Sequence, residues 1–463
     1  MTTRRELLQL MGAGGAGLIA AAAARPLQAQ PGGDALPRRQ GRSAQGYRPV
    51  RTLNGWTLPY RMNNGVKEFH LVAEEIEHEF APGARARCWG YNGTTPGPTI
   101  EAVEGDRVRI FVTNRLKEGT TVHWHGIDLP NGFDGISGLN QPRIEPGETY
   151  VYEYTLKQHG THMYHPHADE MTQMAFGMMG LFIIHPKDGE EEPIDRDYAF
   201  LLHNWALHPG TYRPDPSVMQ DFDLWTFNSR VFPAIDPVVM RTGERLRLRI
   251  GNLSMWNHPI HMHSNPFWVT GSDAGRWPRA QWRREVTEIV GVGQMRDLEF
   301  VATEPGDWAL HCHMAHHTMG PMGHEIPNTV GVDQRGVEAR IRKLLPGYMA
   351  MGKDGMSEHS EHVAMGMQGP ENTLPMMAGQ GQFGPIEMGG MFTVVKVRDD
   401  QAADDYGDPG WYRYPKDQIA RRVSSDPDFG QPQRRDPYGK AAARPATPAA
   451  PPMDHSGHGK HGD

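Results

Sequence analysis

One part of the sequence occurs twice, and this repetition limits the possible folds more than any other feature. The run "EGDRVRIFVTN" at residues 104–114 matches "TGERLRLRIGN" at residues 242–252, an offset of 138 positions. The same offset carries the motif "HWH" at residues 123–125 onto "HMH" at residues 261–263. A second match, at an offset of 146, aligns "GTHMYHPH" with "GDWALHCH". Matches that keep their order and their histidines predict a duplicated structural unit.

Both copies alternate apolar and polar residues in short runs that Gly and Pro interrupt. A period of two over this length predicts half-buried strands in antiparallel sandwiches. No long stretch has the 3.6-residue period that would favour helices. We therefore expect an all-β protein of two tandem Greek-key β-sandwich domains, one over residues 46–190 and one over residues 191–398.

The N-terminus has the features of an export signal. Arg4 and Arg5 precede a weakly apolar, Gly/Ala-rich stretch at residues 12–24, followed by the small-residue cleavage site "LQA". That stretch is shorter than the ~20 strongly apolar residues of a membrane span. We expect residues 1–29 to be a twin-arginine-type signal peptide, and the protein to be periplasmic or secreted without stable membrane insertion.

Other segments are expected to lie outside the sandwich cores. Residues 30–45 are predicted to be a flexible leader, and residues 346–390 a Met-rich insertion in the second domain. The run "MFTVVKV" that follows is predicted to return as the last strand. Residues 399–463 form a polar tail with a His-rich end, predicted to be partly disordered. Acidic residues outnumber basic ones by 55 to 47, so no global basic field favours nucleic acid as a partner.

Four His-x-His pairs are the candidate functional residues. On a strand, residues i and i+2 project from the same face, so each pair presents two imidazoles together. A single pair is weak evidence and is usually a surface feature. Four pairs at equivalent positions of a duplicated fold predict that eight imidazoles converge on one metal centre. The pairs are His123 and His125, His165 and His167, His261 and His263, and His311 and His313.

Cys312 lies between two of these histidines, so its sulfur leaves the opposite face of the strand. A three-residue stretch can therefore reach two metal sites through a very short covalent path, which suits electron transfer. His258, His317 and Met322 are close enough in sequence to complete a thiolate site with two imidazoles and a weak axial thioether, the blue-copper arrangement. Cys88 is predicted to be an inert core residue. A disulfide between the two cysteines is the alternative.

These motifs resemble those of multicopper oxidases of the laccase and copper-resistance types. The four copper-binding motifs of that family match "HWHG", "HPH", "HPIHMH" and "HCHMAHHTMGPM", and "WGYNGTTPGPTIEAVEGDRV" upstream is also similar. The resemblance implies two tandem cupredoxin-like domains and four coppers per subunit: one type 1, one type 2 and two type 3. It implies type 1 ligands His258, Cys312, His317 and Met322; type 2 ligands His123 and His261; and type 3 ligands His125, His165, His167, His263, His311 and His313.

The resemblance also gives Asp134 the role of an acidic residue that relays protons to the cluster. Two positions depart from the family pattern. Pro321 separates Gly320 from Met322, whereas the family usually has Gly directly before the axial ligand, so Met319 is an alternative. Thr318 stands where some members carry a second acidic residue. The proton route is therefore less well defined than the copper ligands.

The two copies differ at the thiolate site. At the aligned offsets, His258 corresponds to Thr120, Cys312 to Pro166 and His317 to Met171. Only the second domain is therefore expected to hold a type 1 copper, the site that gives such proteins their blue colour. Just 90 residues separate His167 from His258, which leaves no room for a third sandwich of ~100 residues. The resemblance then implies that the cluster forms between subunits of a homotrimer.

The expected function is the one-electron oxidation of Cu(I) or a phenol, coupled to the four-electron reduction of O2 to water. The Met-rich insertion favours a role in copper tolerance, because soft thioether ligands select Cu(I). Three alternatives stay open: a general laccase acting on phenols, a copper nitrite reductase, and a non-catalytic periplasmic copper-binding protein. A nitrite reductase needs only one catalytic copper beside the blue one, so four His-x-His pairs argue against it.

Overall fold

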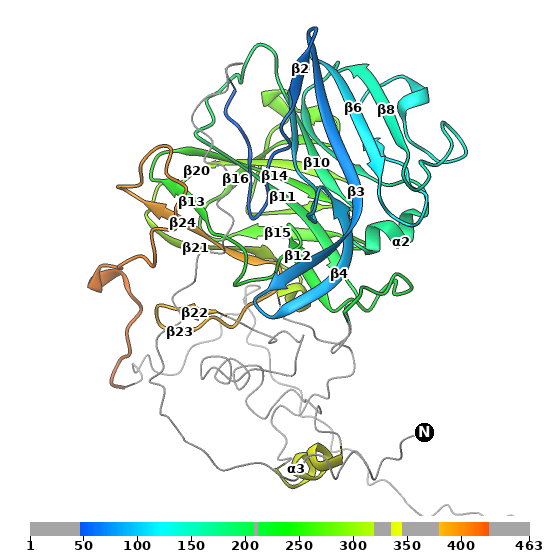
Figure 1. The fold of residues 1–463 in the computed structure, drawn as a ribbon. Helices are drawn as coiled ribbons and strands as arrows, with labels where there is room; N and C mark the ends of the chain where they lie inside the picture. Colours follow the sequence, from blue (N-terminus) through cyan, green and yellow to red (C-terminus); the bar gives the residue numbers. More distant parts are fainter. Residues whose placement is uncertain (1–46, 208–211, 319–334, 345–378, 426–463) are drawn as a thin grey trace, which may run out of the picture. The chain divides into compact units, whose positions relative to one another are not determined.

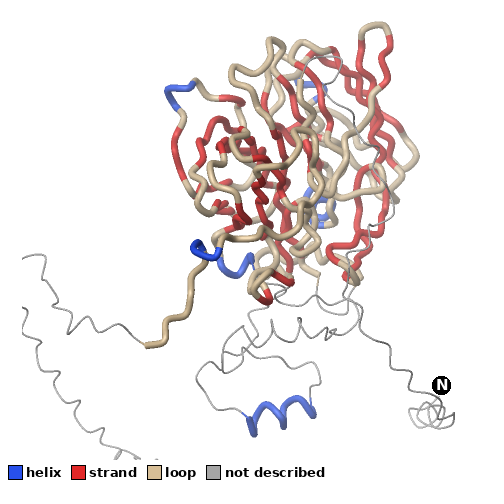
Figure 2. Tube along the Cα trace, turned by 90° about the vertical axis from the view of Figure 1, so that its left-hand side faces the viewer, coloured by secondary structure: helices blue, strands red, loops and turns tan. Residues whose placement is uncertain are grey.

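The computed structural model describes residues 47–207, 212–318, 335–344 and 379–425. The predicted signal peptide and leader, Met319, Met322, most of the Met-rich insertion and the His-rich end lie outside these residues. Strands dominate the described chain (Figure 2). No described helix is long and apolar enough to cross a membrane. The short helical elements are η1 (Asn131–Phe133), α2 (Glu170–Ala175), η2 (Arg279–Gln281), η3 (Ala315–Thr318), α3 (Arg335–Leu344) and η4 (Lys416–Gln418).

The first sandwich consists of a five-stranded and a four-stranded sheet that share one apolar core. Its alternating sequence places every second side chain of β6 in that core, as period-two patterning requires. The five-stranded sheet contains β2 (Arg61–Asn63), β3 (Val66–Ala81), β4 (Ala84–Tyr91), β6 (Arg107–Asn114) and β8 (Thr149–Thr155). The four-stranded sheet contains β5 (Ile100–Val103), β7 (His123–His125), β9 (Gly160–His165) and β10 (Gly180–His185).

The second sandwich consists of an eight-stranded and a five-stranded sheet around another core. The larger sheet contains β1 (Arg51–Thr52), β11 (Arg196–Trp205), β12 (Leu224–Phe227), β14 (Arg245–Asn252), β16 (Phe267–Ser272), β17 (Gly275–Arg276), β18 (Arg283–Glu285) and β20 (Met295–Val301). The smaller contains β13 (Val238–Arg241), β15 (His258–Met262), β19 (Thr287–Val290), β21 (Gly306–Cys312) and β24 (Phe392–Arg398). A separate hairpin joins β22 (Gln380–Gly381) and β23 (Gly384–Pro385).

The duplication read from the sequence is also present in the strand pairing. In the first sandwich β6 pairs parallel with β3 and antiparallel with β8. In the second, β14 pairs in the same way with β11 and β20. The prediction of an all-β chain with two tandem sandwiches is therefore confirmed. Figure 1 shows the blue and cyan strands β3, β6 and β8 on one side, and the green to orange strands β15, β21 and β24 on the other.

Two details differ from the sequence-based expectation. First, β14 is buried along almost its whole length instead of half-buried, because Arg247 and Arg249 are paired with the buried Asp197. Second, β1 adds to the second sandwich by pairing with β11, although it precedes the whole first sandwich in the chain. Neither feature follows from periodicity, since both depend on how the two sandwiches pack together.

A third apolar core joins the two sandwiches. Met163 and Ile183 of the four-stranded sheet pack in one buried cluster with Leu201 of β11 and Met295 of β20. Polar contacts cross the same junction: Thr161 Oγ1 donates to Asp297 Oδ1 at 2.7 Å. The junction therefore fixes the orientation of β9, which carries histidines of the first sandwich.

Candidate metal centres

The buried thiolate site is assembled from β15, β21 and η3. The sulfur of Cys312 lies 3.3 Å from Nδ1 of His317 and 3.6 Å from Nδ1 of His258, and the two nitrogens are 3.1 Å apart. All three side chains are fully buried. Cys312 ends β21 and projects away from its histidine neighbours, as the strand geometry predicted. Three donor atoms thus converge on one point in the core of the second sandwich.

Two neighbouring residues orient the imidazoles. Ser254 Oγ lies 2.7 Å from Nε2 of His258, so Nδ1 is left to face the sulfur. The ring of His317 stacks on Trp225, with centroids 4.7 Å apart and planes 19° apart. Neither residue could be predicted from the sequence, because a serine four positions before a histidine and a tryptophan on another strand match no ligand spacing.

The protonation states of these donors suit a metal ion. Burial lowers the pKa of His258 to about 3 and that of His317 to about 2, so both imidazoles stay neutral and keep a lone pair. Burial also raises the pKa of the Cys312 thiol to about 12. A buried thiol of this kind ionises only when a cation compensates its charge. Two neutral imidazoles and one such sulfur are therefore the donor set of a soft transition-metal ion.

Main-chain hydrogen bonds close the loop that carries these ligands. The N–H of Cys312 donates to the carbonyl of Met391, and the N–H of Met391 donates to the carbonyl of His317. Immediately beside them, the N–H of Gly389 donates to the carbonyl of Thr318 at 2.6 Å. The chain therefore leaves the site after Thr318 and returns to the same point at Gly389, directly before β24.

The first sandwich carries one half of the predicted histidine cluster, on β7 and β9. Donor atoms of His123, His125 and His165 lie within 4.8 Å of one another. Nδ1 of His125 is 3.3 Å from Nε2 of His165, and burial lowers the pKa of His165 to about 3. His167 belongs to the same group, with its ring 5.7 Å from that of His123.

Carboxylates flank this first half-site. Nδ1 of His123 lies 2.8 Å from the carbonyl oxygen of Asp134 and 3.4 Å from its carboxylate. The carboxylate of Glu170, at the start of α2, lies 3.5 Å from Nδ1 of His165 and 3.7 Å from Nε2 of His167. Asp134 was anticipated from the family resemblance. Glu170 was not, although an acidic residue three positions after a His-x-His pair was a signal that could have been followed.

The second sandwich carries the other half, on β15 and β21. Donor atoms of His261, His263 and His311 lie within 4.8 Å of one another, and Nε2 of His263 is 3.1 Å from Nε2 of His311. The ring of His313 lies 5.3 Å from that of His261. Neutral groups orient this half. Nδ1 of His261 lies 2.7 Å from the carbonyl of Val286 and 2.8 Å from Oγ1 of Thr287. Nδ1 of His311 lies 2.8 Å from the carbonyl of Cys312.

Each half-site is complete within its own sandwich but separate from the other. Ring contacts among the described residues join histidines within each half, and none joins His123, His125, His165 or His167 to a histidine of the second half. His263 and His313 are exposed, and His125 and His167 are half-buried. Large apolar side chains beside both halves are also exposed: Leu139, Met171, Val286, Ile289 and Val292.

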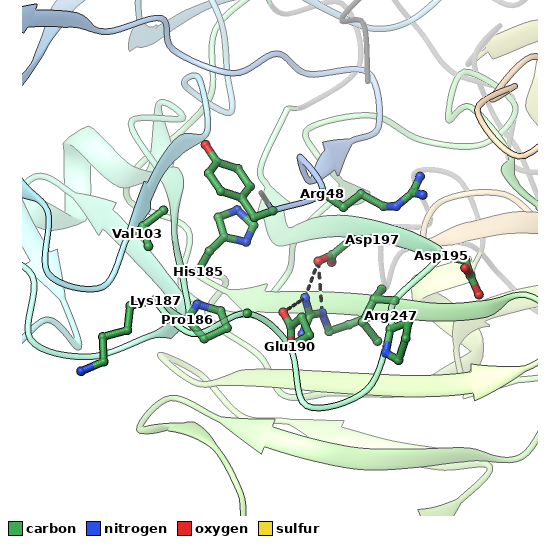
Figure 3. Close-up of a pocket in the computed structure, with 13 residues that line it drawn as sticks. Arg48, Val103, His185, Pro186, Lys187, Glu190, Asp195, Asp197 and Arg247 are labelled. Carbon is green, nitrogen blue, oxygen red and sulfur yellow. Dashed lines mark hydrogen bonds and ion pairs between the residues drawn. The ribbon is translucent and has the colours of Figure 1, made fainter. Parts of the chain in front are cut away.

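A pocket elsewhere in the described chain is lined by none of the predicted ligands. This space of about 300 Å³ is lined by residues that include Arg48, His185, Lys187, Asp195 and Arg247. Figure 3 shows Arg247 bound to Asp197 and Glu190 at its floor. His185 bonds the buried Glu101, so its imidazole is already occupied. The chemistry is therefore concentrated at the histidine groups.

The two cysteines are both free, and Cys88 packs in the core that joins the sandwiches. Thr318 is buried and its hydroxyl donates to the carbonyl of Ala315. Met322 and its alternative Met319 lie outside the described residues, so the structure describes three of the four predicted ligands of the thiolate site. All eight histidines of the four His-x-His pairs lie in one or the other half-site.

Comparison with protein-family models gives two matches, both described as multicopper oxidase, over residues 73–189 and 209–331. Together they span just over half of the chain. Copper resistance protein A of Escherichia coli is 41% identical over 150 residues, which are 32% of this chain and 24% of that protein. L-ascorbate oxidase of Brassica rapa subsp. pekinensis is 37% identical over 155 residues, 32% of this chain and 26% of that protein. The matches thus span about a quarter of the length of these relatives.

A solved structure shares the fold. The blue copper oxidase from Nitrosomonas europaea superposes with a TM-score of 0.52 at 24% identity, covering 71% of this chain and 85% of that chain. At this identity the likeness supports the tandem cupredoxin-like architecture alone. The family matches rest instead on the sequence, and they include all four His-x-His pairs and the Cys312 stretch.

Proposed function

The chain belongs to the multicopper oxidase family, and on this basis we propose that it oxidises a one-electron donor and reduces O2 to water. One observation carries the proposal: the cysteine of a buried donor set of one cysteine and two histidines lies directly between the cluster histidines His311 and His313 in the chain, at the end of β21. Cys312, where electrons would enter, is then directly followed and preceded in the chain by a histidine of the proposed oxygen-reducing cluster. A non-catalytic copper-binding protein would not need that connection.

We assign four coppers per subunit. His258, Cys312, His317 and Met322 would hold type 1 copper, and His123 and His261 would hold type 2. His125, His165, His167, His263, His311 and His313 would hold the type 3 pair. Bound copper would supply one-electron redox chemistry that no side chain of this site provides. The donors fit it, because soft sulfur and neutral imidazole are the ligands that copper prefers.

The chain itself contributes orientation, exclusion of water and proton supply. Ser254 and Trp225 fix the rings of His258 and His317 in a site closed to water, so little reorganisation accompanies electron arrival. Asp134 lies beside His123 with its side chain 29% exposed, which gives it access to both solvent and the half-site. We propose that it passes protons towards the oxygen site.

We propose that the cluster forms between the first sandwich of one subunit and the second sandwich of its neighbour. The separation of the two half-sites within one chain supports this, as do the exposed histidines and apolar side chains beside each. Such a head-to-tail contact is heterologous and closes into a ring, for which we propose a homotrimer. Each ring would then contain three complete clusters.

We propose Cu(I) as the physiological reductant and copper tolerance as the role. The likeness to copper resistance protein A supports this over 150 residues. So does the composition of the segment after Thr318, since nine methionines lie between residues 349 and 391. Because Thr318 and Gly389 are hydrogen-bonded to each other, this segment begins and ends beside the type 1 ligands. We further propose export through the twin-arginine-type signal at residues 1–29, which would carry the protein out of the cytoplasm.

Parallel measurements of turnover test the choice of reductant. Purified, copper-loaded protein is assayed for O2 consumption with Cu(I), Fe(II), Mn(II) and a phenol. A second sample has residues 349–388 replaced by a short Gly/Ser linker. We expect the replacement to lower Cu(I) oxidation sharply and to leave phenol oxidation unchanged or faster. A parallel fall in both, or intact Cu(I) turnover, would support a general laccase, and no O2 consumption at all would support a copper store.

A further inference from the structure

Glu170 lies close to both imidazoles of the pair His165 and His167. One carboxylate oxygen is 3.5 Å from Nδ1 of His165, and the other is 3.7 Å from Nε2 of His167. Its side chain is 43% exposed, so it borders both the half-site and the solvent. A single carboxylate is thus shared between two proposed ligands of the type 3 pair.

The backbone before Glu170 adopts a costly conformation. Asp169 has φ +46° and ψ +50°, in the left-handed region that residues other than glycine rarely occupy. Its side chain makes no capping hydrogen bond to α2, so helix capping does not compensate for the strain. Strained backbone of this kind persists where the surrounding structure requires it, often at functional sites. Here the turn brings the chain back from His167 so that Glu170 faces both histidines.

The second half-site has no equivalent group. Its histidines are oriented by the carbonyls of Val286 and Cys312 and by the hydroxyl of Thr287. Within the described ranges, no carboxylate is in ion-pair contact with any of its four imidazoles. Thr318, at the position where some relatives carry an acidic residue, has its hydroxyl bonded to Ala315. Among the described residues, the carboxylates in ion-pair contact with these histidines, Asp134 and Glu170, therefore both belong to the first sandwich.

We propose that Glu170 is a positioning carboxylate for the type 3 copper ligands, supplied by the first sandwich. This inference rests on the proposed copper cluster. A carboxylate beside a ligating imidazole holds the ring in place and makes it a stronger donor, and losing such a partner typically costs 10- to 100-fold in metal affinity. His165 also bonds the carbonyl of Pro166, so Glu170 adds charge to a ring whose tautomer is already fixed.

The test is the copper affinity of Glu170→Gln, which keeps the size of the side chain and removes its charge. Full-length, copper-loaded protein is equilibrated with increasing concentrations of a chelator, and the retained copper per chain is measured. The blue absorption of the type 1 site serves as an internal reference, because that site lies in the other sandwich. Electron paramagnetic resonance follows the cluster separately. We expect cluster copper to be lost at about 10- to 100-fold lower chelator concentration, with the blue band unchanged.

Two further variants are matched to this one. Glu75→Gln removes an exposed carboxylate of the same sandwich that pairs with Lys117, and it should retain copper as the wild type does. Glu170→Asp keeps the charge with a shorter reach and should recover part of the affinity. Thermal unfolding of the metal-free proteins shows whether Glu170→Gln changes the fold itself.

Each outcome is decisive. Equal retention of cluster copper in Glu170→Gln and the wild type would overturn the inference and leave Glu170 as the first residue of α2. Loss of type 1 and cluster copper together, with a lowered melting temperature, would also overturn it, because the effect would be structural. If the wild type itself bound no copper beyond type 1, the proposed function would fail, and Glu170 would have no copper pair to position.

Discussion

The two sandwiches share a scaffold but differ at the position of the type 1 site. Asn114 in the first and Asn252 in the second end equivalent strands and bind equivalent backbone groups. Where the second sandwich has His258, the first has Thr120, whose hydroxyl donates to Gln173 at 2.6 Å. Gln173 is fully buried and also bonds the carbonyl of Gly119. The same framework thus encloses a metal-type donor set in one copy and a closed pair of polar side chains in the other.

A second contrast concerns matched arginines. Arg109 on β6 pairs with Glu68 and Glu153, and its side chain is 27% exposed. Arg247, its counterpart at the 138-residue offset, pairs with Asp197 and Glu190, and its side chain is 4% exposed. The pairing is equivalent, but the first sandwich covers β14 and nothing comparable covers β6. The arginine–carboxylate pairing is therefore the same in both copies, whereas its contribution to stability should differ because only the second pair is buried.

The largest effect should come from removing the feature that only the second sandwich has. Cys312→Ser should abolish the blue absorption and O2 consumption while leaving most cluster copper in place, because the eight cluster imidazoles are untouched. Absorption spectra, copper content and O2 uptake measure the three quantities. A strong blue band in this variant would show that the thiolate site has been placed on the wrong residues.

The next effect concerns the exposed faces of the two half-sites. Ile289 lies on the edge strand β19 with 58% of its surface exposed, opposite Pro259 and two positions along from Thr287, which is opposite His261. Ile289→Asp should split the proposed ring into single chains that keep the blue band but lose O2 consumption, since burying an unpaired charge opposes association. Light scattering gives the mass. Tyr60→Asp, at an exposed apolar position outside both half-sites, is the control. A fully active single chain would exclude a shared cluster.

The matched arginines predict a difference in stability. Asp197→Asn removes the buried carboxylate that Arg247 and Arg249 share and leaves Glu190 as the remaining partner of Arg247, so it should cost about 3–5 kcal/mol in the free energy of unfolding. Glu68→Gln, the equivalent change beside Arg109, should cost clearly less, because solvent reaches that guanidinium. Chemical denaturation of both variants measures the contrast. Equal losses would mean that burial at the sandwich junction has no energetic consequence.

The smallest effect involves one buried histidine in each sandwich. Burial lowers the pKa of His162 and of His203 to about 4. The unfolded chain, with a histidine pKa of about 6.5, takes up protons first as pH falls, so each residue reduces stability between about pH 6.5 and 4, by roughly 1.4 kcal/mol per pH unit. Replacing either histidine by Phe should therefore make unfolding less sensitive to acid over this range.

At neutral pH the same two replacements should differ from each other. His203 bonds the carbonyl of Leu253 at 2.6 Å, so His203→Phe should cost about 1–3 kcal/mol. No described residue bonds either ring nitrogen of His162, so His162→Phe should be close to neutral. Denaturation at pH 7 and pH 5 separates the two residues. An equal cost at pH 7 would indicate that His162 has a partner, such as a buried water molecule.

The sequence predicted those parts of the site that depend on strand geometry. His311, Cys312 and His313 could be assigned to opposite faces of one strand because side chains alternate there, and the structure has this arrangement. The features it did not predict depend on packing between distant segments. Ser254 approaches His258 across a turn, Trp225 stacks on His317 from another strand, and Glu170 reaches its histidines through a left-handed residue. No periodicity in the sequence encodes such contacts.

The fold shows the same division. Two sandwiches followed from the repeated alternation, but the complete burial of β14 did not, since the alternating arginines read as solvent-facing. Their partner Asp197 lies fifty positions away and contributes no local pattern. The pairing of β1 with β11 likewise spans the whole first sandwich. Long-range electrostatic pairs and strand additions are therefore visible only once the domains are docked.

The hydrogen bond between Gly389 and Thr318 has a consequence for how this protein can change over time. Because the chain leaves and re-enters the second sandwich at one anchored point, a longer or shorter segment between them costs only the slowly growing entropy of loop closure, about 0.6 kcal/mol for each doubling in length. The part of this segment that follows the proposed ligand Met322 can therefore change in length and sequence during evolution while the described ligands His258, Cys312 and His317 stay the same. The same hydrogen bond marks a place for protein engineering, where a new recognition sequence can be inserted ahead of Gly389 close to the type 1 ligands.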